Sequence, residues 1–129
     1  MKVVIMSQNL LRNALEYAWV GATAQGAWSS KCPSLNQCAV TALVIQEYFG
    51  GDLLRCECDD GDSHYWNMLP GDKEVDWTEQ QFEFSGVVPL RETVIIRDRD
   101  YVLSFKSTKR RYKVLLKRVK SYLEEHEND

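Results

Sequence analysis

The chain has 129 residues, of which 44% are hydrophobic and 27% are charged, and its formal net charge is -3. This length suits a single domain over residues 1–129 with a real hydrophobic core, and the composition excludes a disordered or low-complexity chain. The opening segment, residues 1–6, is too short for the apolar part of a signal peptide, and no stretch approaches a membrane span. We therefore expect a cytoplasmic protein without membrane contact, whose four cysteines stay reduced.

Charge is distributed unevenly along the chain. The segment from Lys106 to Lys120 holds eight Lys or Arg residues and no acid, whereas residues 47–83 hold eleven acids. A protein that binds nucleic acid is usually basic overall, and this one is not. We predict no nucleic-acid partner and interpret the basic segment as a solvated helix face that attracts the acidic half of the chain.

The first part of the chain predicts a helix followed by a long loop. Ser7 can cap a helix over residues 8–20, where apolar side chains recur at helical spacing. The loop over residues 21–37 is unusually long for a small domain, and long ordered loops are often functional. Trp28 within it is expected to plug the loop onto the core or to form the wall of a cleft.

Residues 38–49 are apolar on nearly every side, which predicts a helix buried at the centre of the fold. Ser34 and Asn36 mark its start as possible caps, and Gly50 can take the positive φ that ends it. Cys38 then lies in the first turn, where the positive end of the helix dipole stabilises a thiolate. The alternative for Cys38 is a small buried hydrophobic residue.

After the central helix the hydrophobic pattern changes to period two, which is typical of strands. The predicted elements are strands over 53–58, 63–69 and 74–78, a short helix after Thr78, strand-like segments over 87–90 and 92–96 with an edge at Pro89, and a last helix capped by Ser107 or Thr108. Together they predict an α+β domain, with a buried central helix packed on a small antiparallel sheet and with additional N- and C-terminal helices.

A catalytic arrangement is predicted around His64, because the other histidine, His126, lies in a fraying tail. In a hairpin turning at Pro70 and Gly71, residues whose numbers sum to about 140 lie opposite each other, so His64 faces Asp76 or its neighbour. The carboxylate would fix the imidazole and leave its other nitrogen to take the thiol proton. Nucleophile, base and orienting acid then serve amide hydrolysis or acyl transfer.

An acyl-transfer intermediate also needs donors for its oxyanion, and the backbone N–H of Cys38 is suitably placed at a helix start. The side-chain donor could be Gln37, Asn36 or Gln25, and we favour Gln37. Trp66 shares a strand face with His64 and is expected to shield the catalytic pair from water, forming the cleft wall together with Trp28.

A cysteine at the start of a buried helix, a histidine on a strand and an acid before a tryptophan on the next strand follow one another along the chain. This order resembles the papain-like cysteine hydrolase and transferase fold. Four strings of the chain are Asn36-Gln37-Cys38-Ala39-Val40-Thr41-Ala42-Leu43, Gly50-Gly51-Asp52, Ser63-His64-Tyr65-Trp66-Asn67 and Val75-Asp76-Trp77-Thr78-Glu79-Gln80-Gln81-Phe82. They are similar to those of the bacterial YunG-like family, and this resemblance, which covers most of the chain, supports the papain-like fold with Cys38, His64 and Asp76 at the site. The chain is much shorter than a full protease and leaves little wall for a peptide cleft, so we expect a small-molecule or peptide-like amide or acyl substrate.

Two other functions compete with catalysis. One is a zinc site built from Cys56, Cys58 and His64 with Cys32 or Cys38, although the spacing of Cys56 and Cys58 is poor for a zinc knuckle. The other is a binding or regulatory module that keeps the fold without the chemistry. No glycine-rich phosphate loop stands between a strand and a helix, so no cofactor is expected, and we predict no bound metal.

Overall fold

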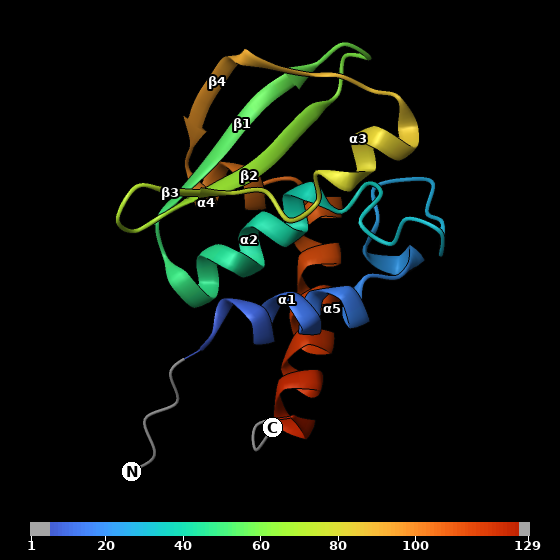
Figure 1. Ribbon diagram of the computed structural model, residues 1–129, viewed down its shortest axis with the longest axis vertical. Helices are drawn as coiled ribbons and strands as arrows, with labels where there is room; N and C mark the ends of the chain where they lie inside the picture. The colour runs from blue at the N-terminus through green and yellow to red at the C-terminus, as the bar shows by residue number, and fades with distance from the viewer. Residues whose placement is uncertain (1–5, 127–129) are drawn as a thin grey trace.

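The computed structural model describes residues 6–126. Most of the opening segment that argued against a signal peptide, residues 1–5, lies outside the described residues, as do tail residues 127–129. The described chain has an α+β fold with five α-helices and a four-stranded antiparallel sheet, the sheet lying over α2 while α1 and α5 pack below it (Figure 1). Its elements are α1 (Gln8–Ala18), the 3₁₀ helix η1 (Gly21–Thr23), α2 (Cys38–Phe49), β1 (Asp52–Cys58), β2 (Ser63–Leu69), β3 (Lys73–Val75), α3 (Gln80–Ser85), β4 (Pro89–Arg97), α4 (Arg99–Leu103) and α5 (Lys106–Glu125).

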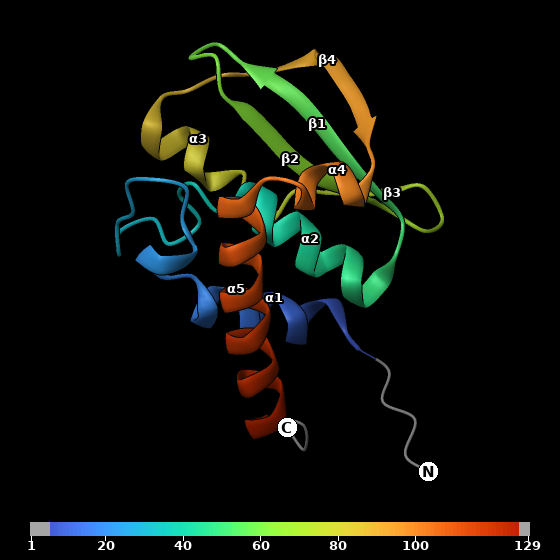
Figure 2. The same ribbon diagram turned by 180° about the vertical axis from the view of Figure 1, so that it is seen from behind.

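Helix α1 begins and ends with hydrogen bonds that side chains supply. The hydroxyl of Ser7 accepts from the N–H of Leu10 at 3.0 Å, which confirms the predicted cap. At the other end, Nε of Arg118 on α5 donates to the carbonyl oxygen of Ala18 at 2.9 Å. These contacts satisfy backbone groups that a helix terminus otherwise leaves without partners, and the second one fixes α1 against α5, which runs vertically in Figure 2.

Helix α2 lies at the centre of the core, as predicted. Val40, Leu43 and Val44 are fully buried between the sheet, α1 and α5. The helix ends at Gly50 with φ 75°, and Gly51 follows with φ 81°. A Cβ atom on Gly51 would collide with the carbonyl oxygen of Met68, so glycine is required there by both conformation and space.

The strand order in the sheet is β3-β2-β1-β4. Strands β1 to β3 form the predicted meander, and β4 lies at the edge beside β1, as Pro89 indicated. The predicted segments 87–90 and 92–96 are joined in the single strand β4 from Pro89 to Arg97, and residues 87 and 88 lie outside it. Its pairing with β1 changes register between Arg55 and Glu57.

The register of the β2–β3 hairpin differs from the prediction by two residues. Met68 pairs with Glu74 and Leu69 with Lys73, because the turn holds three residues and places Gly71 and Asp72 at positive φ. An even shift keeps every side chain on its predicted face. Strand β3 ends at Val75, so Asp76 follows the strand instead of lying within it.

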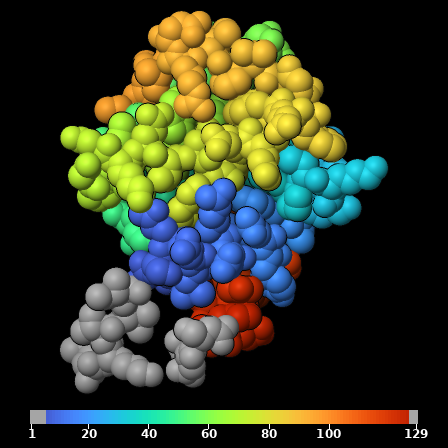
Figure 3. Space-filling view, in the orientation of Figure 1, coloured from blue at the N-terminus to red at the C-terminus, as the bar shows by residue number. Residues whose placement is uncertain are grey.

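The two faces of β2 have different surroundings. On one face, Nδ2 of Asn67 donates to the carbonyl oxygen of Ala42 in α2 at 2.9 Å. On the other face, Trp66 packs with Leu54 and Cys56 in a second apolar cluster. His64 shares this second face with Trp66. In Figure 3, the chain from β3 to β4, yellow to orange, covers the side of the molecule that faces the viewer.

The C-terminal part of the described chain departs from prediction in two ways. Helix α4 was not predicted, and α5 begins at Lys106 with Phe105 as its N-cap and no side-chain cap. The expectation that Ser107 or Thr108 caps α5 was wrong, because both lie inside its first turn. Within residues 6–126, no helix has the length and apolar character that crossing a membrane requires.

Candidate active site

His64 and Asp76 form a buried hydrogen-bonded pair. Nε2 of His64 lies 2.6 Å from Oδ2 of Asp76, and the two side chains are only 1% and 7% exposed. Thr78 donates its hydroxyl to the other carboxylate oxygen at 3.5 Å, and Nη2 of Arg91 lies 3.4 Å from Oδ2. The contact predicted between His64 and Asp76 is present, although Asp76 reaches the ring from beyond the end of β3.

Aromatic rings hold the His64 imidazole on two sides. Trp66 stacks on it with ring centroids 5.3 Å apart, and Phe82 meets it edge-on at 4.5 Å. Trp66 is itself fixed, because its Nε1 donates to Glu74 at 2.7 Å and the Arg91 guanidinium lies over its ring. Trp66 thus shields the imidazole from water, as predicted, but it lines neither cavity next to Cys38.

The electrostatic surroundings of His64 favour the imidazolium form. Burial alone lowers the pKa of His64, but the hydrogen bond to Asp76 and the interactions with Cys38 outweigh it and raise this pKa to about 9. Nδ1 of the ring is buried, and none of the residues 6–126 accepts or donates a hydrogen bond at this nitrogen. Because Nε2 is engaged by Asp76, Nδ1 is the nitrogen left to exchange a proton.

Cys38 opens α2 and is half-buried, whereas Cys32, Cys56 and Cys58 are buried. Its Sγ donates to the carbonyl oxygen of Ser63 at 3.8 Å. The N-cap of α2 is Gln37, and its side chain makes no capping hydrogen bond. The expectation that Ser34 or Asn36 caps this helix was therefore wrong. The backbone N–H groups of the first turn, including that of Cys38, therefore receive no hydrogen bond from a side-chain cap. They point toward the N-terminal end of the helix, where Cys38 lies.

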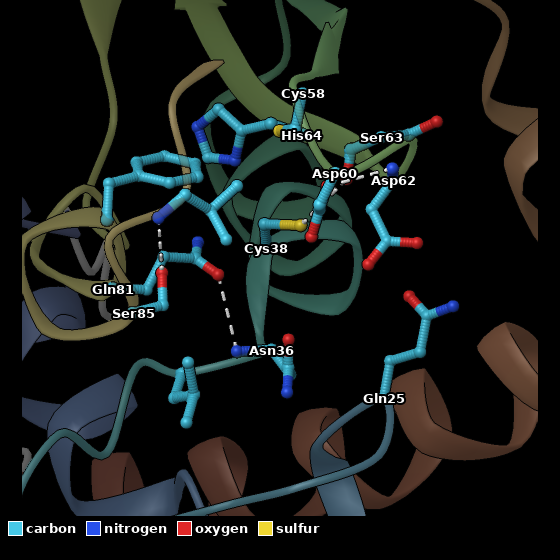
Figure 4. Close-up of a pocket in the computed structure, with 13 residues that line it drawn as sticks. Gln25, Asn36, Cys38, Cys58, Asp60, Asp62, Ser63, His64, Gln81 and Ser85 are labelled. Carbon is cyan, nitrogen blue, oxygen red and sulfur yellow. Dashed lines mark hydrogen bonds between the residues drawn. The ribbon is translucent and has the colours of Figure 1, made fainter.

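Cys38 lies between two cavities of opposite charge. The first, of about 120 Å³, contains the His64 ring together with Asp60 and Asp62 (Figure 4). The second, of about 290 Å³, contains Arg55 and Arg111. Three residues line both cavities: Gln25, Cys38 and Ser63.

The structure does not bring every predicted site residue to these cavities. Gln37 is fully buried, and its side chain accepts from Thr23 at 2.7 Å and donates to Val20 at 3.0 Å, so it is unavailable to an oxyanion. Asn36 lines the first cavity, but its side-chain amide donates to Ala27.

Gln25 and Trp28 come from the same long loop but differ in position. Gln25 is exposed and lines both cavities, as Figure 4 shows for the first one. Trp28 lines neither, because its Nε1 donates to the carbonyl oxygen of Pro33 within the loop at 3.0 Å. Trp28 therefore does not form the cleft wall that was predicted for it, and Gln25 is the loop residue at the site.

The other thiols near the site are held in the neutral form. Burial raises the pKa of Cys56, and burial together with Cys56 and nearby acids raises that of Cys58 to about 12. Within residues 6–126, no three His, Cys, Asp or Glu residues are grouped in a way that could hold a metal ion.

Two residues of the site escaped sequence reasoning. Phe82 on α3 touches His64, and nothing in the local pattern pointed to it. Arg111 is only 4% exposed, and a signal for it existed, because it stands four residues before Leu115 on the apolar stripe of α5. An arginine on a buried helix stripe is unusual enough to suggest a polar site beneath it.

The fold and site define an α+β domain with a half-buried cysteine at a helix start and a buried His–Asp pair lining the adjoining cavity. The family described as YunG protein matches residues 7–124, so the chain belongs to the YunG family. It is 43% identical over 56 residues to the uncharacterized protein YunG of Bacillus subtilis (strain 168). That match covers 43% of this chain and 47% of the relative, which is less than half the relative's length. No solved structure matches the chain.

Proposed function

We propose that the protein is a thiol-dependent amide hydrolase or acyltransferase with a papain-like arrangement of Cys38, His64 and Asp76. The observation that carries this proposal is the buried 2.6 Å contact between His64 and Asp76, with Nδ1 of His64 left unpartnered in the cavity that also contains Cys38. A buried imidazole that is oriented by a carboxylate on one nitrogen can exchange a proton on the other.

In the proposed reaction, the Cys38 thiolate attacks the carbonyl carbon of an amide, and the Sγ–C bond forms. The tetrahedral intermediate collapses as the C–N bond breaks, and the departing amine takes the proton from Nδ1 of His64. Water or an acceptor amine then attacks the thioester and gives a proton back to His64. The Sγ–C bond breaks, which releases the acid or the new amide and restores the thiolate.

The oxyanion of each intermediate is proposed to be bound by the backbone N–H of Cys38 and the side-chain amide of Gln25. The absence of a side-chain cap on α2 supports the first donor, and the position of Gln25 on both cavities supports the second. Preorganised donors of this kind contribute on the order of 3 kcal/mol each to transition-state stabilisation. Cavities of about 120 and 290 Å³ suit small-molecule or short peptide-like amides.

Alkylation with iodoacetamide at neutral pH tests the proposal. We expect Cys38 to react at least about tenfold faster than the other three cysteines, and His64→Ala to slow it, because the imidazolium stabilises the thiolate. His126→Ala is the matched control and should leave the rate unchanged, since His126 lies at the end of α5. Equal reactivity of Cys38 in the native protein and the His64→Ala variant would refute the proposal.

A binding module without chemistry is the second candidate. It is favoured by one observation, the donation of the Cys38 thiol to the carbonyl oxygen of Ser63. In such a protein, His64→Ala would leave the alkylation rate of Cys38 unchanged.

A further inference from the structure

The second cavity contains a buried cation without an acidic partner. Arg111 is 4% exposed, and its Nε and Nη2 contact only the hydroxyls of Ser107 and Thr108, both at the long distance of 3.3 Å. Among the described residues it takes part in no salt bridge. Burying a guanidinium without an anion is costly, so a buried arginine that faces a cavity favours an anionic ligand there. Within the described chain, the anionic group that acts on Arg111 is the Cys38 thiolate, and it loses its charge when it is acylated.

The rest of the cavity lining suits the same kind of ligand. Arg55 is its second cation and is held in place by two hydrogen bonds to the Ser63 hydroxyl, at 3.0 and 2.7 Å. The described lining includes no acid, and its remaining polar side chains are the Gln25 amide, the Cys38 thiol and several hydroxyls, among them those of Tyr65 and Tyr101. The first cavity, with Asp60 and Asp62, has the opposite charge and would repel an anion.

Helix α5 adds a third contribution. It is 20 residues long, and its N-terminus has no side-chain cap, so the N–H groups of its first turn and the positive end of its dipole are directed toward this region. Ser107 and Thr108 of that turn line the cavity beside Arg111.

The proposed chemistry determines which part of a substrate enters which cavity. The leaving amine must receive its proton from His64, and the ring lines only the first cavity. The acyl group attached to Cys38 therefore extends into the second. A leaving amine that becomes an ammonium ion is also favoured beside Asp60 and Asp62.

We propose that the second cavity is an acyl pocket for a carboxylate, and that the substrates are amides of short dicarboxylic acids whose free carboxylate binds Arg111 and Arg55. This assignment rests on the proposed function, because it takes Cys38 as the nucleophile. An arginine fork binds a carboxylate through two parallel hydrogen bonds. A volume of about 290 Å³ holds a short acyl chain but no folded peptide.

The pocket can be tested with two alkylating reagents of the same size, anionic iodoacetate and neutral iodoacetamide. The measured quantity is the rate of Cys38 alkylation by iodoacetate divided by the rate by iodoacetamide, because the intrinsic reactivity of the thiol cancels in this ratio. We expect Arg111→Gln to lower this ratio about tenfold, which corresponds to a loss of about 1.4 kcal/mol in the interaction with the anionic reagent. Arg111→Lys should give an intermediate ratio, because it keeps the charge without the fork.

Arg110→Gln is the matched control, because it removes the same charge from an exposed neighbouring position of α5. It should leave the ratio unchanged. An unchanged ratio in Arg111→Gln, or an equal fall in Arg110→Gln, would overturn the pocket assignment. Failure of the catalytic proposal gives a different result, namely the same iodoacetamide rate at Cys38 in the native protein and in His64→Ala.

Thermal unfolding of the Cys38→Ser variant gives a second readout that needs no reaction. Glutarate should raise the melting temperature, glutaric diamide should not, and the effect of glutarate should disappear when Arg111→Gln is added. Stabilisation by inorganic phosphate without stabilisation by glutarate would overturn the carboxylate assignment, as would equal effects of glutarate and its diamide.

Discussion

Replacing Asp76 by Asn tests how much the buried pair stabilises the fold. In the native protein the pKa of His64 is raised from 6.5 to about 9. A raised pKa in the folded state means that the folded protein binds the proton more tightly than the unfolded chain does. The resulting stability is fully present below about pH 6.5 and is lost as the pH rises through about 9.

The size of this effect follows from the shift. Each pKa unit corresponds to about 1.4 kcal/mol, so the raised pKa of His64 contributes about 3 kcal/mol to the free energy of unfolding below pH 6.5. Asp76→Asn removes the carboxylate whose hydrogen bond is the largest single cause of the increase, while the interactions with Cys38 remain. The variant should lose about 1 to 3 kcal/mol at pH 6 and much less at pH 9.5.

Urea unfolding at a series of pH values measures this dependence, and NMR titration of the His64 ring gives its pKa directly. Glu74→Gln is the matched control, since Glu74 contacts Trp66 and Arg91 and not His64. It should keep both the pKa and the pH dependence. A native protein whose stability is flat between pH 6.5 and 9, or an Asp76→Asn variant with an unchanged His64 titration, would refute the reasoning.

Two further predictions concern the fold. Gly51→Ala should destabilise the protein by about 3 kcal/mol in urea unfolding, because the added Cβ meets the Met68 carbonyl oxygen. Gly50→Ala, with open space around the added Cβ, should cost about 1 kcal/mol. Equal losses in the two variants would mean that the contact with Met68 does not require glycine at position 51. Ser7→Ala removes the cap of α1 and should cost about 1 kcal/mol. If Ser7→Ala lowers the free energy of unfolding no more than replacement of a surface serine that caps no helix, the Ser7 cap does not stabilise α1.

Features set by local patterns could be predicted from the sequence. The apolar run after Cys38 gave the central helix, and alternation along β2 gave the separate faces of His64 and Asn67. The pairing of His64 with Asp76 was predicted despite a register error, because a shift by two residues does not change the face of a side chain.

Features that depend on distant parts of the chain could not be predicted. The Gln37 side chain accepts a hydrogen bond from Thr23 in η1, 14 residues earlier, and no local pattern encodes this contact. Helix α4 is too short for a periodic signal and is held by Arg99, which reaches Leu43 and Glu47 on α2. The papain-like arrangement likewise depends on tertiary placement, and it stays a proposal.

The packing of Trp66 and Phe82 around His64 determines which group has to move when a proton is exchanged. A ring held on two sides and anchored to Asp76 cannot turn over without first breaking a buried hydrogen bond. Cys38, in contrast, is half-buried, and only a weak contact to Ser63 holds its thiol. Rotation of a side chain about χ1 takes picoseconds to nanoseconds. In the proposed mechanism, the imidazole is therefore the fixed group of the site, and the Cys38 side chain is the group that can rotate.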